Sequence, residues 1–175
     1  VTHMLTREDG LSSEVILRTV NDTKSDGVFI VTSNGLCYMD VDGSIRRLDK
    51  FPYFNNYDIW AKDADTLFVM SSAGIYVVDR DDLLSDSPEL NYDLLDARRG
   101  LNSALTANSW NYSDARGNLF LPCDTGVFII DTGRYTASTS SYRMSVSSVK
   151  LDNVETRLDK DSPIEVPRGV SKIEL

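Results

Sequence analysis

The chain has 175 residues, of which 41% are hydrophobic and 26% charged, enough for one ordinary soluble domain or parts of two. Its 18 Lys and Arg against 27 Asp and Glu give a net charge of -9, which disfavours nucleic acid and anionic membrane surfaces as partners. Two cysteines and one histidine are too few for a disulfide framework or a His-rich zinc site.

The apolar runs of the sequence are short. None exceeds four or five residues, whereas a membrane-spanning helix needs about 20, so the sequence predicts no such helix. Residues 1–10 have neither the basic start nor the apolar run of a secretion signal. We therefore expect any signal or anchor of the parent protein to lie outside this chain.

Three copies of one pattern follow one another up to residue 131. Each copy has a glycine, four apolar or aromatic residues and an aspartate, at residues 35–40, 74–79 and 126–131. A second apolar run begins seven residues before each glycine, at Val28, Leu67 and Leu119. The glycines are 39 and 52 residues apart, and the polar stretch 80–90 explains the larger spacing as an inserted loop. The underlying unit is therefore about 40 residues long.

Each copy is expected to form four short antiparallel strands with little room for a helix. In the first copy, apolar runs between turn residues predict strands at 15–20, 28–32, 36–40 and 45–48. The pair Asn34-Gly35 supplies the positive φ angles of a tight hairpin, and Gly74 and Gly126 hold the same corner in the later copies. A unit of about 40 residues with four strands is typical of a β-propeller blade.

The expected fold class is all-β: a partial β-propeller of about three four-stranded blades, followed by the first strands of an immunoglobulin-like β-sandwich. The blades are placed at residues 1–49, 50–84 and 85–136, the last of them including the inserted loop. Propellers close with about 4 to 8 blades. Three blades leave open edges, which we expect the rest of the propeller or another copy to cover.

Residues 137–175 are expected to hold a linker and an incomplete sandwich. The linker begins in the Thr-, Ser- and Gly-rich stretch 132–141, and strand-like stretches follow at 143–151, 164–166 and 170–175. A complete immunoglobulin-like domain needs about 100 residues, so only its opening strands fit here.

The blade sequences resemble a known family, the two-component regulator propellers of bacterial membrane-anchored sensors. The segments Gly10-Leu11-Ser12-Ser13 and Gly100-Leu101-Asn102-Ser103 are similar to the Gly-Leu-x-Ser opening of its blades. Residues 114–119 and 32–36 are similar to its turn and hairpin motifs. The resemblance covers about residues 4–136 and continues more weakly from Tyr142 into the family's immunoglobulin-like juxtamembrane domain. The second copy departs from the pattern, because Lys50-Phe51-Pro52 stands near the place of the Gly-Leu opening.

This resemblance implies an extracytoplasmic sensing region, periplasmic or at the cell surface. The parent chain would continue through a membrane helix into a cytoplasmic histidine kinase or diguanylate cyclase, and would act as a dimer. Family members in gut bacteria often sense carbohydrate breakdown products, so oligosaccharide is the first ligand class implied. The fragment itself is expected to bind and transmit rather than to catalyse, with no cofactor.

Candidate ligand contacts lie in the densest aromatic stretch, residues 51–60. It combines flat apolar faces with amide groups, which suits stacking against a sugar ring. Tyr53, Asn55, Asn56 and Tyr57 are the candidates within it. The alternative is that this stretch packs in the core, where large aromatic side chains contribute most of the buried area.

Two tryptophans favour that alternative for part of the stretch. Trp60 and Trp110 stand three and four residues before Asp63 and Asp114, which lie between expected strands. A similar spacing in two copies predicts a repeated core position for both tryptophans.

The remaining reactive residues have ordinary interpretations. His3 aligns with residues of the third copy that are predicted to form a strand.

Cys37 and Cys123 occupy different repeat positions and are expected to be buried thiols. A disulfide between neighbouring blades stays open as the alternative, and it would need Cα atoms within about 7 Å. Residues 40–44 resemble the start of a calcium loop, but Phe51 stands where an EF-hand requires glutamate, so a hairpin is favoured. Residues 79–82 are read as a solvated acidic turn.

Two other classes of function stay open at this stage. A propeller lyase or glycosidase acting on polysaccharide would need acids, bases or metal ligands clustered on one face, and a single histidine without metal-ligand spacing argues against this. A catalytic carboxylate pair among the 27 acids cannot be read from one sequence. A passive protein-interaction scaffold is not distinguishable from a sensor by sequence.

Overall fold

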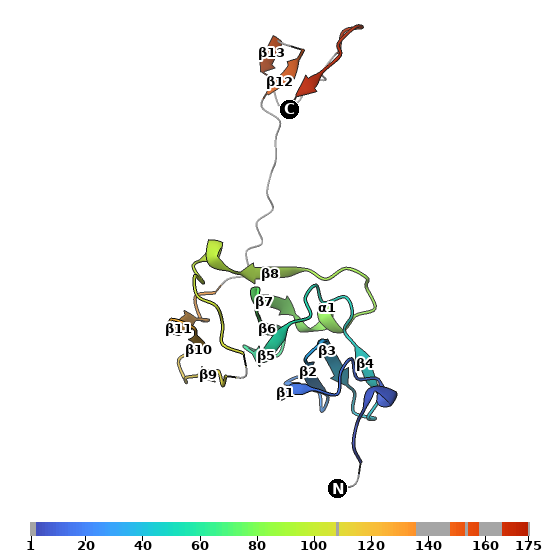
Figure 1. The fold of residues 1–175 in the computed structure, drawn as a ribbon, viewed down its shortest axis with the longest axis vertical. Coiled ribbons are helices and arrows are strands. Elements are labelled where there is room, and N and C mark those ends of the chain that lie inside the picture. The colour runs from blue at the N-terminus through green and yellow to red at the C-terminus, as the bar shows by residue number, and fades with distance from the viewer. Residues whose placement is uncertain (1–2, 108, 136–147, 153, 158–165, 175) are drawn as a thin grey trace. The chain divides into compact units, whose positions relative to one another are not determined.

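The computed structural model describes residues 3–107, 109–135, 148–152, 154–157 and 166–174. The chain divides into two compact units, Val1–Ser138 and Thr139–Leu175, close to the boundary expected at residue 137. Both units consist of antiparallel sheets (Figure 1), which confirms the all-β fold class. Among the described residues, no helix is long and apolar enough to cross a bilayer.

The first repeat forms the first sheet. Its four strands are adjacent in sequence order and are β1 (Ile16–Asn21), β2 (Val28–Thr32), β3 (Gly35–Met39) and β4 (Ile45–Arg47). Each strand lies within one residue of its expected bounds, because short apolar runs bounded by Asp, Asn and Gly fix both the strand and its turns.

The second sheet also has four strands in sequence order. They are β5 (Asn56–Ala61), β6 (Thr66–Ser71), β7 (Gly74–Asp79) and β8 (Tyr92–Leu95). Because β8 pairs with β7, this sheet extends to Leu95, past the boundary expected at residue 84.

The connection between β7 and β8 differs from the loop expected there. It begins with a short helix, α1 (Arg80–Leu84), where an inserted loop was expected. The Asp79 carboxylate accepts a hydrogen bond from the Asp82 N–H at 2.8 Å and so caps the helix. Leu83 and Leu84 are buried against the core between the first two sheets, which explains why a polar stretch forms a helix here.

The third sheet contains three strands among the described residues. They are β9 (Tyr112–Ser113), β10 (Asn118–Cys123) and β11 (Gly126–Asp131), in the order β11-β10-β9. Leu105 adds an isolated antiparallel bridge to Cys123.

The three repeats turn their central hairpins in the same way. Gly35, Gly74 and Gly126 have φ angles of 124°, 129° and 149°, a region that glycine enters without the strain of a side chain. Asn34 does not share this conformation, since Asp152 is the non-glycine residue with positive φ in the described part of the chain. The prediction of a glycine corner is confirmed, and that of a positive φ at Asn34 is wrong.

At two of these corners, the side-chain hydroxyl three residues before the glycine makes two hydrogen bonds across the turn. The Thr32 hydroxyl accepts from the Asn34 N–H at 3.2 Å and donates to the Gly35 carbonyl at 3.2 Å. Ser71 makes the same pair of bonds in the second sheet, at 3.1 Å and 2.9 Å. The third sheet has Cys123 at this position, three residues before its glycine.

The sheets stack face to face, with the second sheet between the other two (Figure 1). Since alternate residues of a strand point to opposite faces, each sheet has a backward face, toward the preceding sheet, and a forward face, toward the next. The forward face of the first sheet carries Phe29, Val31, Leu36 and Tyr38 and meets Leu67, Val69, Tyr76 and Val78 on the backward face of the second. The forward face of the second sheet carries Phe68, Met70, Ile75 and Val77 and meets Leu119, Leu121, Phe128 and Ile130.

The first strand of each sheet in chain order (β1, β5 and β9) is called its inner strand. One large apolar residue before each inner strand completes the apolar layer on the backward face of its sheet. Phe51 is buried between the first and second sheets, and Leu101 between the second and third. Leu11 is buried on the backward face of the first sheet, with Ile30 and Cys37. Phe51 therefore takes the place of the leucine in the Gly-Leu-x-Ser motif, which explains the departure of the second copy from that motif.

The residue two positions after each of these large apolar residues is hydrogen-bonded to the central hairpin of its own sheet. Ser13 is hydrogen-bonded to Ser33 at 2.8 Å, and Ser103 to Thr125 at 2.6 Å. In the second sheet, the equivalent bond joins Tyr53 to Ser72 at 2.8 Å. The Gly-Leu-x-Ser motif thus combines a core residue with a hairpin brace.

The second unit contains a three-stranded sheet. Its strands are β12 (Ser148–Leu151), β13 (Val154–Arg157) and β14 (Ile173–Glu174), in the order β13-β12-β14. The Asp152 carboxylate accepts hydrogen bonds from the N–H groups of Ser171 and Lys172 at 3.1 Å and 2.9 Å, which ties the β12–β13 turn to the segment before β14. The strand β13 was not expected, because its alternating charged residues hide the apolar pattern of a strand. Parts of the strands expected at 143–151 and 164–166 lie outside the described residues.

Candidate ligand-binding site

Two of the predicted ligand contacts brace the second hairpin. The Tyr53 hydroxyl and the Asn55 amide both reach the Ser72 hydroxyl, at 2.8 Å and 3.0 Å. The Tyr53 ring also stacks on Tyr76, with ring centroids 6.0 Å apart. These contacts account for both side chains within the fold, and a ligand contact by either stays a prediction.

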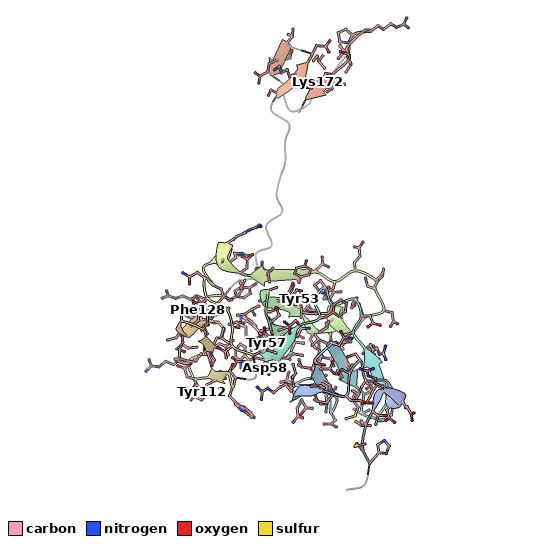
Figure 2. All side chains as sticks on the ribbon, viewed as in Figure 1. Tyr53, Tyr57, Asp58, Tyr112, Phe128 and Lys172 are labelled. Atoms are coloured by element: carbon pink, nitrogen blue, oxygen red, sulfur yellow. The ribbon has the colours of Figure 1, made fainter. Side chains whose placement is uncertain are left out.

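The other two predicted contacts lie at the start of β5. Asn56 is buried, and its amide donates to the Tyr53 carbonyl at 2.8 Å; its Oδ1 atom has no hydrogen-bond partner among the described residues. Tyr57 is half-buried and sits at a β-bulge, where the pairing with β6 shifts between Asn56 and Asp58. Figure 2 shows Tyr57 and Asp58 as neighbours on this strand.

The strand β1 has the same bulge one repeat earlier. Its pairing with β2 shifts between Ile16 and Arg18, so Arg18 and Asp58 both follow a bulge on the inner strand of their sheet. A bulge turns the side chain that follows it and often lies beside a functional site. The equivalent position in the third repeat is Trp110.

That equivalence follows from the strand pairing. Val20, Trp60 and Tyr112 pair with the equivalent residues Phe29, Phe68 and Phe120. The residues two positions before Val20, Trp60 and Tyr112 are Arg18, Asp58 and Trp110. Trp60 therefore corresponds to Tyr112 and not to Trp110, and the predicted repeated core position of the two tryptophans is wrong. Trp60 packs against Phe68 in the core, whereas Trp110 is 80% exposed.

Arg18, Asp58, Trp110 and Asn111 form one cluster, which we call the inner-strand cluster. Arg18 Nε lies 3.2 Å from Asp58 Oδ1, and the Asn111 amide donates to Asp58 Oδ2 at 2.7 Å. The Arg18 Nη2 group donates to the Ser109 carbonyl at 2.6 Å, and the guanidinium lies 4.2 Å from the centre of the Trp110 ring. Each of the three sheets or its approach segment contributes to this cluster.

The Arg18–Asp58 pair is largely shielded from water. Their side chains are 15% and 12% exposed. Burial raises the pKa of the Asp58 carboxyl above its ordinary value, and the Asn111 hydrogen bond and the Arg18 charge oppose this shift. Arg18 Nε is within ion-pair distance of Asp58 but meets no acceptor at a hydrogen-bonding angle, so the attraction between the two groups is mainly Coulombic.

This geometry leaves one face of the Trp110 indole available. A guanidinium covers one face of the ring as a cation–π contact, while the high exposure of Trp110 leaves the other face to solvent. A flat apolar surface beside an amide and a neutralised ion pair can stack a ring and donate or accept hydrogen bonds at its edge. Both charged groups of the cluster have partners: Arg18 contacts Asp58 and the Ser109 carbonyl, and Asp58 accepts from Asn111.

A hollow adjoins the second hairpin on the side of Ser72. It has a volume of about 360 Å³ and is lined mainly by polar and small residues, among them Ser72, Asp96, Arg98, Asn102 and Ser103. Tyr53 and Asn55 support one wall of it through Ser72.

The other residues singled out by sequence have structural roles. His3 is exposed outside any strand, 3.6 Å from Asp9, so its expected strand position is wrong. Cys37 is buried and Cys123 half-buried, and both are free thiols. Within the described part of the chain, no three His, Cys, Asp or Glu side chains are grouped to hold a metal ion.

The acidic turns are also part of the fold. Residues 40–44 form the β3–β4 hairpin, in which the Asp40 N–H donates to the Ser44 carbonyl at 2.9 Å. The turn at 79–82 is the helix cap of α1, and Asp81 pairs with Lys24 at 2.6 Å and with Arg80 at 2.7 Å. It is therefore engaged in ion pairs.

Fold and cluster together define a repeat protein of stacked antiparallel sheets with a polar and aromatic cluster on its inner strands. The chain matches no family model and no curated protein. Among solved structures, it is similar to the extracellular domain of a protein described as a one-component system from B. thetaiotaomicron, with a TM-score of 0.35 and 18% identity. The match covers 77% of this chain and 23% of that one, so the chain spans about a quarter of the length of the solved domain.

Proposed function

We propose that this chain is the ligand-binding and signal-transmitting part of an extracytoplasmic bacterial sensor, and that the inner-strand cluster binds a neutral carbohydrate. The parent protein would carry a histidine kinase or diguanylate cyclase as its output, as the Gly-Leu-x-Ser resemblance implies. The observation that carries the proposal is the exposed Trp110, whose ring centre lies 4.2 Å from the guanidinium of Arg18, which is itself paired with Asp58 in a largely buried ion pair.

The position of the cluster suits signal transmission. Its members come from the first strands of two sheets and from the segment that leads into the third, so a ligand that changes the contact between Trp110 and Arg18 also changes how these parts are held together. A ligand shifts a conformational equilibrium only by the difference of its affinity for the two states. A contact that spans sheets is a place where such a difference arises.

The chemistry of the cluster favours a neutral sugar over an anion. Asp58 neutralises Arg18, and the chain carries a net charge of -9, so little attraction for an anion is left. The free face of Trp110 suits the apolar face of a pyranose ring, and the Asn111 side chain lies beside it in sequence to meet hydroxyl groups.

A binding assay tests the proposal. Melting temperature and calorimetry are measured with a panel of neutral oligosaccharides and a matched panel of uronic-acid oligosaccharides, since a ligand that binds the folded state raises stability by about 2.7 kcal/mol at 100 times its Kd. We expect a neutral sugar to raise the melting temperature, and Trp110→Ala to weaken its binding by about tenfold or more, as loss of an aromatic anchor does.

Phe54→Ala is the matched control, because Phe54 is an exposed aromatic residue outside the cluster. It should bind the sugar as the unchanged chain does. The proposal fails if no neutral oligosaccharide binds, or if Trp110→Ala binds as tightly as Phe54→Ala.

A further inference from the structure

The hollow beside the second hairpin has the size of a small-molecule site. Its volume is about 360 Å³, near the lower end of the range of about 300–1,000 Å³ that is usual for ligand sites. One wall is the turn of the β6–β7 hairpin, and the other is formed by residues between Asp96 and Leu105, which lead from β8 toward the third sheet. Both walls belong to the first unit. The hollow therefore suits a ligand of one ring with a short polar chain.

The repeat shows why this hollow exists. Phe54 and Ala104 each stand three residues after the large apolar residue that precedes their inner strand. The Phe54 ring lies beside the glycine of the first hairpin, 3.6 Å from the position of a Cβ atom on Gly35. In the next repeat, the methyl group of Ala104 and the second hairpin glycine, Gly74, both line the hollow. The hollow thus lies where a phenyl ring lies one repeat earlier.

Two groups of opposite charge line the hollow without an ion-pair partner. The Asp96 carboxylate accepts a hydrogen bond from the backbone N–H of Arg98 at 2.9 Å, but within the described residues neither side chain is paired with a group of opposite charge. Ser72 and Asn102 add a hydroxyl and an amide group to the lining. A ligand that carries both charges meets a partner for each, whereas a simple anion is repelled by Asp96 and a neutral sugar leaves both charges unpaired.

We infer that the hollow binds a free amino acid with an aromatic side chain. Its α-carboxylate pairs with Arg98 and its α-ammonium group with Asp96, through charge-assisted hydrogen bonds. Its ring takes the place that Phe54 fills one repeat earlier, beside the small residues Ala73 and Ala104. No member of the inner-strand cluster lines this hollow, so the inference does not rest on the proposed sugar site.

A set of four ligands tests the inferred chemistry by calorimetry. They are L-phenylalanine and three analogues that each lack one feature: phenethylamine lacks the carboxylate, phenylpropionate lacks the ammonium group, and glycine lacks the ring. We expect L-phenylalanine to bind and to raise the melting temperature with concentration. Each analogue should bind about tenfold more weakly or less, because each leaves one charged group or the ring position without a partner.

Substitutions of the charged residues locate the site. Arg98→Gln and Asp96→Asn each remove one charge and should weaken the binding of L-phenylalanine by about tenfold or more. Asp96 caps the short turn that follows it, and asparagine keeps this cap, so Asp96→Asn should remain folded. Arg116→Gln is the matched control, because Arg116 is exposed in the β9–β10 turn and does not line the hollow. It should bind as the unchanged chain does.

A third substitution tests the origin of the hollow. Ala104→Phe supplies the ring that Phe54 supplies one repeat earlier, and Ala104 is exposed, so this variant should fold and should no longer bind L-phenylalanine. Circular dichroism checks the fold of every variant, and the two charge variants decide the test if Ala104→Phe does not fold. The inference is overturned if L-phenylalanine does not bind, if phenylpropionate binds as tightly, or if folded Ala104→Phe binds as the unchanged chain does. Each of these results leaves the sugar site to its own test.

Discussion

Asp22 is the buried acid that joins the first sheet to the second. Its side chain is 1% exposed, and it accepts hydrogen bonds from Arg80 Nε at 3.2 Å, the Ser25 hydroxyl at 2.7 Å and the Tyr38 hydroxyl at 2.7 Å. Burial alone would raise the pKa of this carboxyl, but these donors hold the pKa well below its ordinary value. The charge is stable in the interior only because Arg80 arrives from α1.

Replacing Asp22 with alanine should therefore destabilise the fold strongly. Removal of one partner of a buried ion pair costs about 3–5 kcal/mol, and in this variant Arg80 would keep only its pair with the exposed Asp81. Urea denaturation of the Asp22→Ala variant measures this loss. Asp65→Ala is the control, because Asp65 pairs with Lys24 on the surface, where such pairs contribute about 0–1 kcal/mol. Equal losses in the two variants would contradict the role given to Asp22.

The same carboxyl predicts a pH dependence. Since the pKa of Asp22 is lower in the folded state than its ordinary value of 3.8, its contribution to stability is complete above about pH 5 and is lost as pH falls from there through the folded pKa. Other carboxyls also titrate in this range, so the quantity to measure is the difference in unfolding free energy between the unchanged chain and Asp22→Asn. We expect this difference to shrink steadily from pH 5 to pH 2; a constant difference would show that Asp22 is not ionised in the fold.

The hairpin corners are the elements that the three repeats share most closely, yet their surroundings differ. A Cβ atom on Gly74 would lie 2.3 Å from the Leu95 carbonyl oxygen, whereas one on Gly126 would meet nothing within 4 Å. Both glycines have positive φ angles, of 129° and 149°. The second corner therefore carries a packing constraint in addition to the conformational one.

Gly74→Ala should accordingly cost more than Gly126→Ala. Positive φ alone costs an alanine about 1–2 kcal/mol, and overpacking against the backbone of Leu95 adds about 1–3 kcal/mol. Thermal or urea unfolding of the two variants gives the comparison. Equal destabilisation would mean that β8 moves away from β7 at no cost, against the close pairing seen between Ile75 and Leu95.

Element prediction succeeded where the signals are local. The hairpin around Gly35 and the turn at Asp42-Gly43 each lie within a dozen residues of both strands they join, so composition and spacing are enough to place them. The strand β8 was placed in the wrong blade because the inserted segment with α1 separates it from its partner β7. Its own sequence does not reveal which strand it pairs with.

The stack as a whole has an uneven distribution of burial. Both faces of the second sheet are covered by neighbouring sheets, whereas the forward face of the third is open to solvent. Local opening is easiest where few apolar contacts hold a strand. The second sheet should therefore be the most persistent part of the first unit.

Amide hydrogen exchange tests this expectation. Amides of β6 and β7 should exchange most slowly and those of β11 at least about tenfold faster, since tenfold corresponds to about 1.4 kcal/mol of opening free energy. Protection of β11 equal to that of β6 would show that a different part of the chain covers the third sheet.

The inner-strand cluster shows what sequence could not provide. The aromatic stretch around Tyr53 was singled out for its composition, but its side chains brace a hairpin. Arg18 and Asp58 are 40 residues apart and meet only because two bulged inner strands lie side by side. Trp110 was assigned by its spacing from Asp114, whereas the pairing of Tyr112 with Phe120 sets the true alignment. Aligning the repeats by the residues that pair with Phe29, Phe68 and Phe120 places Arg18, Asp58 and Trp110 at one position, and this pairing is known only from the structure.

The Asp22–Arg80 pair also helps to determine which sheets pack against each other. The three sheets are alike enough that a refolding chain could collapse with the first sheet against the third. In that wrong order, the Asp22 carboxylate would be buried in an apolar layer without a guanidinium partner, because Arg80 belongs to the insertion after β7. Like the Arg18–Asp58 pair, this ion pair forms only when the first sheet packs against the second, so it penalises the misassembled topology and favours the correct order of sheets.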